Sequence, residues 1–236
     1  MSKILQKGEL GYGILIEQDA GYISTDLNPK ILTEGFSFNP NEPVLVNCVL
    51  QKWGVKNKNG RIYPKEILVP QIEEYMKLVE ENAALSEADH PDSSIVSLDN
   101  ISHAIKKMWW GQGADENVLY GQLEIVVTRG YFELGIASMI GDKIMEYLRR
   151  GYKLGISSRG VGSLKEVRGE NIVQNDFELI CFDLVASPST PGAYLFPSEN
   201  EMSIGSLKMG ETKYSMNNLL NEEKKNIVNA IDRFLL

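Results

Sequence analysis

The sequence contains few of the residues that build metal centres and disulfide-bonded folds. Only two cysteines and two histidines occur among its 236 residues. Cys48 and Cys181 each lie inside an apolar run, so we predict two buried free thiols rather than a disulfide. Structural zinc needs about four ligands at characteristic spacing, and no such pattern is found. We therefore expect no metal and no cofactor.

Two further features are missing, namely a long apolar run and an excess of positive charge. No run approaches the roughly 18 apolar residues that mark a membrane-spanning helix. The formal net charge is −8, which makes nucleic acid and anionic membrane poor default partners. The sequence therefore indicates a soluble globular protein that binds neither.

Composition divides the chain into four parts. Residues 1–42 form an N-terminal extension rich in Gly, Asn and Pro, and residues 43–197 hold the apolar segments of a folded domain. Residues 198–214 are polar and Gly/Ser-rich, which is typical of a linker. Residues 215–236 carry apolar side chains at helical spacing and predict an amphipathic C-terminal helix.

The periodicity of apolar residues predicts a mixture of strands and helices. Strands are predicted over residues 13–17, 43–53, 101–110, 118–128, 153–158, 162–167, 172–174 and 177–185, and helices over 70–82 and 132–150. Because the helices do not alternate regularly with the strands, we expect an α+β fold with a mainly antiparallel sheet or small barrel core.

The two histidines have different surroundings. His90 lies in the segment ALSEADHP among acidic residues, and could bind a cation, sit idle in a surface turn, or serve as a general base. The cation is the weakest of these interpretations because further ligands are missing. His103 alternates with Ile101 and Ile105, which predicts a half-buried structural histidine.

A Gly/Ser-rich run at residues 155–163 offers a candidate nucleophile. It lacks both the GxxxxGK[ST] pattern of a phosphate loop and the GxSxG elbow. It is either the end of a strand followed by a turn, or a serine nucleophile beside a backbone shaped by glycine. Strand geometry points Ser157 and Ser158 to opposite faces, so at most one can face His90.

An acidic residue completes the set of types that a catalytic triad needs. Asp183 lies in the apolar run LICFDLV, where an unpaired carboxylate would be costly to bury. It could form a structural salt bridge or orient His90. A Ser–His–Asp hydrolase is therefore one interpretation among several.

Several segments taken in order resemble one family. They are VKNKNGRIYP at 55–64, ALSEADHP at 84–91, MWW at 108–110, YG at 120–121, RGYKLGISSRGVGSL at 150–164 and FELICFDLVASPSTP at 177–191. Together they resemble the prohead maturation serine proteases of T-even-like tailed bacteriophages, a family distantly similar to herpesvirus assemblin. The resemblance covers about residues 43–197, which it identifies as a protease domain with an assemblin-like fold.

The resemblance implies a role for each candidate residue. His90 matches the family's base, Ser157 its nucleophile and Asp183 its third member, while Ser158 is the fallback nucleophile. Ser158, Arg159 and Gly160 are implied to support the oxyanion site, together with the loop over residues 186–190.

The resemblance also implies substrates and a location. The substrates would be scaffold or core proteins and the major capsid protein inside the prohead, within the host cytoplasm, cut after Glu in a [Leu/Ile]-x-Glu pattern. Self-association is compatible with the resemblance. Self-processing is implied as well, and the matches at 32–34 and 220–222 lie in the two ends, which we expect to be weakly structured and accessible to a protease. The C-terminal helix would either dock on its own domain or bind the scaffold and be removed on activation.

Two rival functions are kept. One is a non-catalytic core or scaffold protein of the prohead that has kept the fold, in which Ser157, His90 and Asp183 would not converge. The other is a serine hydrolase acting on small esters, which the missing elbow motif disfavours.

Overall fold

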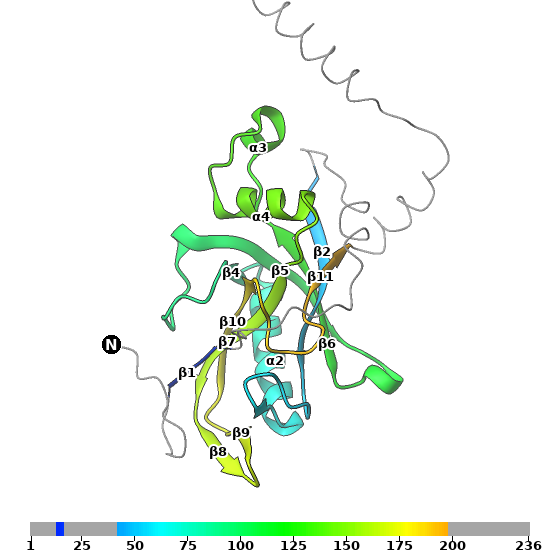
Figure 1. Ribbon diagram of the computed structural model, residues 1–236, viewed down its shortest axis with the longest axis vertical. Helices are drawn as coiled ribbons and strands as arrows, with labels where there is room; N and C mark the ends of the chain where they lie inside the picture. Colours follow the sequence, from blue (N-terminus) through cyan, green and yellow to red (C-terminus); the bar gives the residue numbers. More distant parts are fainter. Residues whose placement is uncertain (1–12, 17–41, 198–236) are drawn as a thin grey trace, which may run out of the picture. The chain divides into compact units, whose positions relative to one another are not determined.

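The computed structural model describes residues 13–16 and 42–197 (Figure 1). The described residues fall in one compact unit, residues 1–202. The predictions for the linker at 198–214, for the C-terminal helix and for most of the N-terminal extension lie outside the described residues. None of the described helices has the length and apolarity to cross a membrane.

The described part is a mixed α+β structure dominated by antiparallel strand pairs. Its strands are β1 (Gly13–Ile16), β2 (Val44–Lys52), β3 (Arg61–Ile62), β4 (Leu85–Glu87), β5 (Ile101–Trp110), β6 (Val118–Ile125), β7 (Gly155–Gly162), β8 (Leu164–Val167), β9 (Glu170–Val173), β10 (Glu178–Val185) and β11 (Leu195–Pro197). Its helices are α2 (Lys65–Glu80), α3 (Arg129–Leu134) and α4 (Ile140–Arg149), with 3-10 turns at Leu98–Asn100 and Gly113–Asp115.

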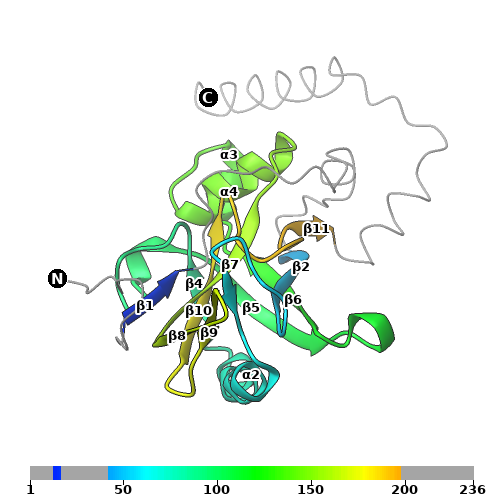
Figure 2. The same cartoon turned by 60° about the horizontal axis from the view of Figure 1, so that its bottom comes forward.

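Two sheets make up the centre of the fold. One has the order β1-β7-β10 and the other the order β11-β2-β6-β5-β4. A parallel bridge between Ala88 and Leu184 joins β4 to β10, and an antiparallel bridge between Gly155 and Tyr194 joins the start of β7 to the approach of β11. The two bridges close the sheets into a ring, which places β7 and β10 beside the segment that follows β4 (Figure 2).

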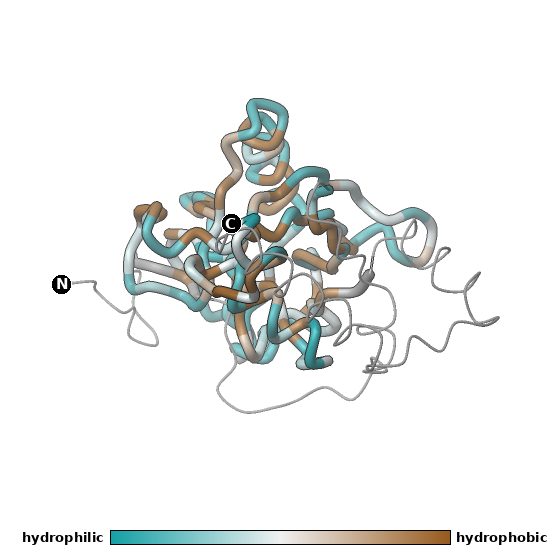
Figure 3. The backbone as a smooth tube through the Cα atoms, turned by 90° about the horizontal axis from the view of Figure 1, so that it is seen from above, coloured by the Kyte–Doolittle hydropathy of each residue, from teal (hydrophilic) through white to brown (hydrophobic). Residues whose placement is uncertain are grey.

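The core is apolar and is covered by helices on the central strands. Helix α2 packs on β5 and β10, where Tyr75 meets Phe182 edge to face, and α4 packs on β5 and β6. Apolar and polar stretches alternate along the chain (Figure 3), as expected of strands that bury one face. Cys48 and Cys181 are both buried and free, which confirms the prediction from their apolar surroundings.

The interpretation of residues 155–163 as a strand end followed by a turn was wrong, whereas the strand predicted over residues 162–167 is present as β8. Residues 155–162 form one continuous strand, β7. Its glycines serve close packing: a Cβ on Gly160 would lie 2.5 Å from the ring of Phe177, and one on Gly162 would lie 2.9 Å from the Phe177 Cα. The run is therefore glycine-rich because Phe177 lies against it, not because the chain reverses there.

Both predicted helices have different bounds in the structure. Helix α2 begins at Lys65, five residues before Pro70. Proline has no N–H to donate to the carbonyl of Glu66, and the helix tolerates this because both residues are exposed to water. The helix predicted over residues 132–150 is divided into α3 and α4, because Gly135 adopts a left-handed conformation with φ 67° and ends α3. In α4 the buried stripe is Ile144, Met145 and Leu148.

Candidate active site

The chain turns sharply between β4 and the loop that carries His90. Asp89 has a left-handed backbone with φ 57°, and its N–H donates to the carbonyl of Leu184 at 2.8 Å. Asparagine and aspartate tolerate this conformation better than most residues. The turn therefore anchors the loop on β10 and brings His90 beside the strand that carries Asp183.

His90 and Asp183 form a buried hydrogen-bonded pair. His90 Nδ1 lies 2.7 Å from Asp183 Oδ2, and the exposed fractions of the two side chains are 1% and 0%. Because a carboxylate only accepts, Nδ1 carries the proton, and in the neutral ring Nε2 is left as the acceptor. Within the described part of the chain this buried Nε2 has no hydrogen-bond partner. The expectation of an idle surface turn at His90 is wrong, since the ring is buried and paired.

Ser157 lies directly across from Asp183 in the antiparallel pairing of β7 with β10. Residues directly opposite each other place their side chains on the same face of the sheet, with Cβ atoms roughly 5 Å apart. The Phe182 carbonyl accepts a hydrogen bond from the His103 ring, and the Leu184 carbonyl accepts one from the Asp89 N–H. The backbone carbonyls of Phe182 and Leu184 therefore point away from β7. The backbone of Asp183, between them, therefore faces Ser157.

Ser158 projects from the other face of β7. It lies opposite Phe182, and its hydroxyl accepts a hydrogen bond from Gln51 Nε2 at 2.9 Å. Gln51 Oε1 in turn accepts from the Thr190 hydroxyl at 2.6 Å. All three side chains are buried, so Ser158 belongs to a network that connects β2, β7 and the loop over residues 186–190.

The loop over residues 186–190 is packed tightly against the start of β7. A Cβ on Gly155 would lie 2.4 Å from Pro188 Cδ, so only glycine lets the loop approach this closely. The Ser189 carbonyl accepts from the Lys58 N–H at 3.1 Å. Together with the Thr190–Gln51 bond, these contacts hold the loop against Gly155, which lies two residues before Ser157 in β7.

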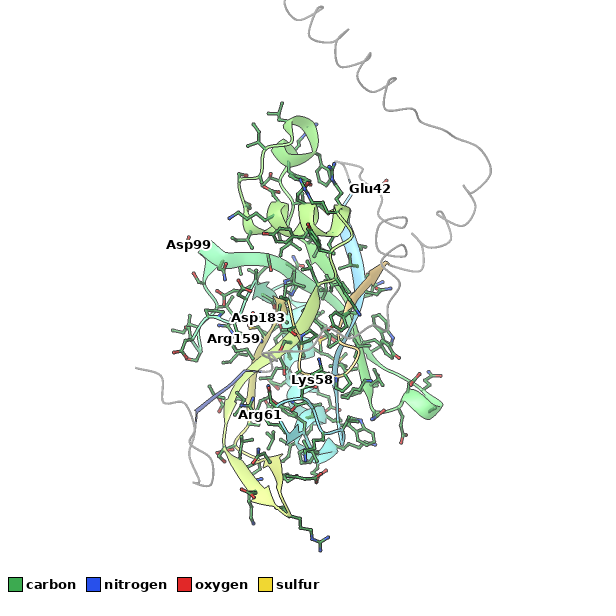
Figure 4. All side chains as sticks on the ribbon, in the orientation of Figure 1. Glu42, Lys58, Arg61, Asp99, Arg159 and Asp183 are labelled. Atoms are coloured by element: carbon green, nitrogen blue, oxygen red, sulfur yellow. The ribbon has the colours of Figure 1, made fainter. Side chains whose placement is uncertain are left out.

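Arg159 shares the face of β7 that carries Ser157. Figure 4 shows Arg159 and Asp183 together in the middle of the described part, on neighbouring strands. The guanidinium lies 2.9 Å from Asp183 Oδ2 through Nε and donates to Asp183 Oδ1 at 3.3 Å through Nη2. Nη2 also donates to the carboxylate of Glu87, which is likewise buried. Gly160, which was also predicted to support the oxyanion site, lies on the other face of β7 and packs against Phe177.

His103 is buried in β5 as a structural residue, more deeply than predicted. Its Nδ1 lies 2.8 Å from the Ser102 hydroxyl and its Nε2 lies 2.9 Å from the Phe182 carbonyl. Burial lowers the pKa of His103 to about 4, although the nearby Asp183 carboxylate and the Phe182 carbonyl oppose this. The ring is therefore neutral near neutral pH.

Sequence reasoning missed several residues around the candidate triad. The partnership of Glu87 with Arg159 joins residues 72 positions apart, and Gln51 reaches Ser158 over 107 positions. One signal was available, because strand alternation places Arg159 on the face of Ser157. The described residues hold no cluster of three or more His, Cys, Asp or Glu side chains arranged for a metal.

A family comparison accounts for this arrangement of segments. The profile of the family described as prohead core protein serine protease matches residues 30–204. The chain belongs to this family of prohead core proteases. It is 35% identical over 197 residues to the prohead core protein protease of Enterobacteria phage T4, covering 82% of this chain and 81% of that protein.

A solved structure of a protease supports the same assignment. The capsid assembly protease of bacteriophage T4 superposes with a TM-score of 0.57 at 26% identity, covering 75% of this chain and 99% of that one. This chain therefore shares its mixed fold, dominated by antiparallel strands, with that assembly protease, and the family assignment gives it a role as a protease of head maturation.

Proposed function

We propose that this prohead core protease is a serine endopeptidase in which Ser157 is the nucleophile, His90 the general base and Asp183 the orienting acid. The observation that carries the proposal is the 2.7 Å contact between His90 and Asp183 on the face of the sheet where Ser157 lies opposite Asp183. A non-catalytic core protein gives no reason to bury a histidine with an unpartnered Nε2 beside a carboxylate.

The proposed reaction follows from these positions. His90 Nε2 takes the proton of the Ser157 hydroxyl as the oxygen attacks the scissile carbonyl. The Nδ1–carboxylate bond fixes the ring tautomer and stabilises the imidazolium that forms. The imidazolium then protonates the leaving amine. His90 next takes a proton from a water that attacks the acyl carbon, and it returns the proton to the Ser157 oxygen as the acyl bond breaks.

The oxyanion site is proposed to lie along the edge of β7 that faces the loop over residues 186–190. The N–H of Ile156 donates to the Ala193 carbonyl on this edge. Alternate residues of a strand direct their N–H groups to the same edge, so the N–H of Ser158 is directed there too. Backbone N–H groups of Ser158 and of the loop would stabilise the negative charge that develops on the substrate oxygen. In this arrangement the Gln51–Ser158–Thr190 network supports the oxyanion site and supplies no nucleophile.

The matched pair Ser157→Ala and Ser158→Ala tests the nucleophile. Each variant is incubated with purified prohead scaffold protein, and cleavage is followed on gels and by mass spectrometry. Ser157→Ala is expected to lose at least about 10³-fold in rate, since the nucleophile and its base act as a unit. Ser158→Ala keeps the nucleophile but loses one bond of the network that supports the oxyanion site, so it is expected to lose much less rate than Ser157→Ala. Cleavage by Ser157→Ala with loss in Ser158→Ala would reverse the assignment.

The proposed substrates are the scaffold and capsid proteins of the immature head, cut after Glu in a [Leu/Ile]-x-Glu pattern, and the chain itself. Most matches in this sequence involve folded elements: 72–74 and 78–80 lie in α2, 85–87 forms β4, 144–146 lies in α4, 164–166 lies in β8, and 15–17 begins in β1, which pairs with β7. The described residues of these matches have backbones held in hydrogen bonds, so a protease reaches them poorly. The matches at 32–34 and 220–222 lie outside the described residues and are the proposed sites of trimming.

Intact mass spectrometry of the active protein tests self-processing. Cleavage after Glu34 or Glu222 is expected in the wild type, and Glu34→Gln and Glu222→Gln are each expected to block the cut at that position alone. The Ser157→Ala chain, which lacks the proposed nucleophile, should keep its full mass under the same conditions. Active enzyme with both termini intact would contradict trimming.

A further inference from the structure

A second set of buried charges lies behind the histidine–aspartate pair. Arg159 on β7 and Glu87 on β4 both have side chains with 0% exposure, and they bind each other through Nη2 and a carboxylate oxygen. Charged side chains are almost never fully buried unless they are paired. The catalytic scheme proposed above uses neither residue, so their burial beside the site requires its own explanation.

Arg159 connects the two halves of the candidate triad. Its Nε and Nη2 contact both carboxylate oxygens of Asp183, while its Nη1 donates to the carbonyl of Ser93 at 2.9 Å and to that of Pro91 at 3.4 Å. Pro91 and Ser93 belong to the loop that carries His90. A planar guanidinium holds such a set of acceptors in fixed directions, which the single ammonium of lysine does not.

Glu87 strengthens the same arrangement from β4. Its backbone N–H donates to Asp183 Oδ1 at 3.2 Å, and its carboxylate accepts from the Ser97 N–H at 3.2 Å as well as from Arg159. The residue thus touches the acid of the triad through its backbone and the loop of His90 through its side chain.

The remaining titratable groups around the pair are neutral or exposed. They are Tyr75 on α2, His103 on β5 and Cys181 on β10, with Asp89 and Asp92 exposed on the loop and Lys143 exposed on α4, where it lines a pocket with Asp89 and Leu184. Burial raises the pKa of the Tyr75 phenol and of the Cys181 thiol, and burial lowers the pKa of His103 to about 4. The buried charged residues in contact with the His90–Asp183 pair are therefore Arg159 and Glu87, both through Asp183.

We propose that Arg159 is a positioning residue that holds Asp183 and the His90 loop in register, and that Glu87 balances its charge so that His90 faces a net charge of −1. The proposal rests on the proposed function, because it assigns how the acid and the base of that site are held. It distinguishes Arg159 from a donor to the oxyanion, since its guanidinium is directed to Asp183, Glu87, the Cys181 sulfur and two loop carbonyls.

The charge arrangement predicts opposite effects of two substitutions on the pH profile. Arg159→Met removes a positive charge beside the His90–Asp183 pair, which makes protonation of the pair more favourable. The acidic limb of the pH profile of kcat/KM therefore moves to higher pH. Glu87→Gln removes a negative charge, so the acidic limb moves to lower pH. Shifts of at least roughly half a pH unit are expected for charges this close. The double variant is expected to return the limb toward the wild-type position.

The experiment measures kcat/KM of the full chain on purified scaffold protein between pH 5 and pH 9. Arg150→Met is the control, because it removes an arginine whose side chain is 63% exposed and bound to Glu146, away from the site. Its limb is expected to stay at the wild-type position. Arg159→Lys keeps the charge but loses the planar contacts, so it should lower kcat with little movement of the limb.

The outcomes separate this proposal from the proposed function. If Ser157→Ala cleaves scaffold as the wild type does, the proposed function fails. If cleavage depends on Ser157 but neither Arg159→Met nor Glu87→Gln moves the acidic limb, the triad stands and the role of Arg159 is overturned. Should Arg159→Met fail to fold, Glu87→Gln decides alone: a limb displaced to lower pH supports the proposal, and an unmoved limb overturns it.

Discussion

Two histidines separated by 13 positions illustrate how a side chain acquires its chemistry from its partners. His103 meets a hydroxyl and a backbone carbonyl in a buried strand, whereas His90 meets the carboxylate of Asp183. A carbonyl offers no charge to compensate an imidazolium, and burial then keeps the ring neutral. A carboxylate both orients the ring and stabilises its charged form, which is what a general base requires.

His103 is expected to link stability to pH. Its pKa of about 4 in the folded protein lies below the ordinary value of 6.5, so on acidification the unfolded chain takes up the proton first. The stability that His103 contributes is fully present above about pH 6.5 and is lost as the pH falls toward 4. Between pH 7.5 and pH 5 the loss is about 2 kcal/mol.

Urea denaturation of the wild type and His103→Gln at both pH values measures this loss. Glutamine keeps a donor for the Phe182 carbonyl but does not titrate. The variant is expected to be less stable at pH 7.5 and to lose about 2 kcal/mol less than the wild type on going to pH 5. Equal losses in the two proteins would show that His103 does not couple stability to pH.

At the scale of elements, strand β7 determines what the site can hold. It presents Ser157 and Arg159 on one face and Ser158 and Gly160 on the other, so one strand supplies both the proposed nucleophile and the arginine that contacts Asp183. Its glycines admit Phe177 on the second face and Pro188 at its start. The strand is therefore closely covered at the residues where the site is built.

Gly160→Ala and Gly130→Ala test this packing against a matched control. A Cβ at Gly160 would lie 2.5 Å from the Phe177 ring and 2.6 Å from the Glu178 carbonyl oxygen, so we expect a loss of about 1–3 kcal/mol in the free energy of unfolding. A Cβ at Gly130, within helix α3, meets nothing within 4 Å and should stabilise the protein by about 0.5–1 kcal/mol. Chemical denaturation measures both, and similar values for the two variants would contradict the packing argument.

Local patterns in the sequence account for most elements and miss those that depend on distant neighbours. The bounds of β5 were predicted to the residue because Ile101–Trp110 carries its own alternation. The continuity of β7 was missed because glycines are typical of turns, and the sequence does not show that Phe177 packs against Gly160 and Gly162. The division of residues 132–150 depends on one left-handed glycine, Gly135, that helical spacing alone does not expose.

At the scale of the whole molecule, the candidate site is assembled by topology. His90 and Asp183 are 93 positions apart, and the bridge of Ala88 to Leu184 brings them together. The residue types and the family resemblance selected the proposed triad, but no sequence pattern indicated the Arg159–Glu87 pair, because its contacts depend on the meeting of β4, β7 and β10. Pairings across a closed ring of strands are not encoded in any single segment.

Covalent labelling with diisopropyl fluorophosphate tests the central claim most directly. The reagent phosphorylates an activated serine, and peptide mass spectrometry identifies which serine carries the adduct. We predict an adduct on Ser157 that disappears in His90→Gln, since the base on Asp183 is what activates the hydroxyl. An adduct on Ser158, or a fully active enzyme that acquires no adduct, would contradict the account.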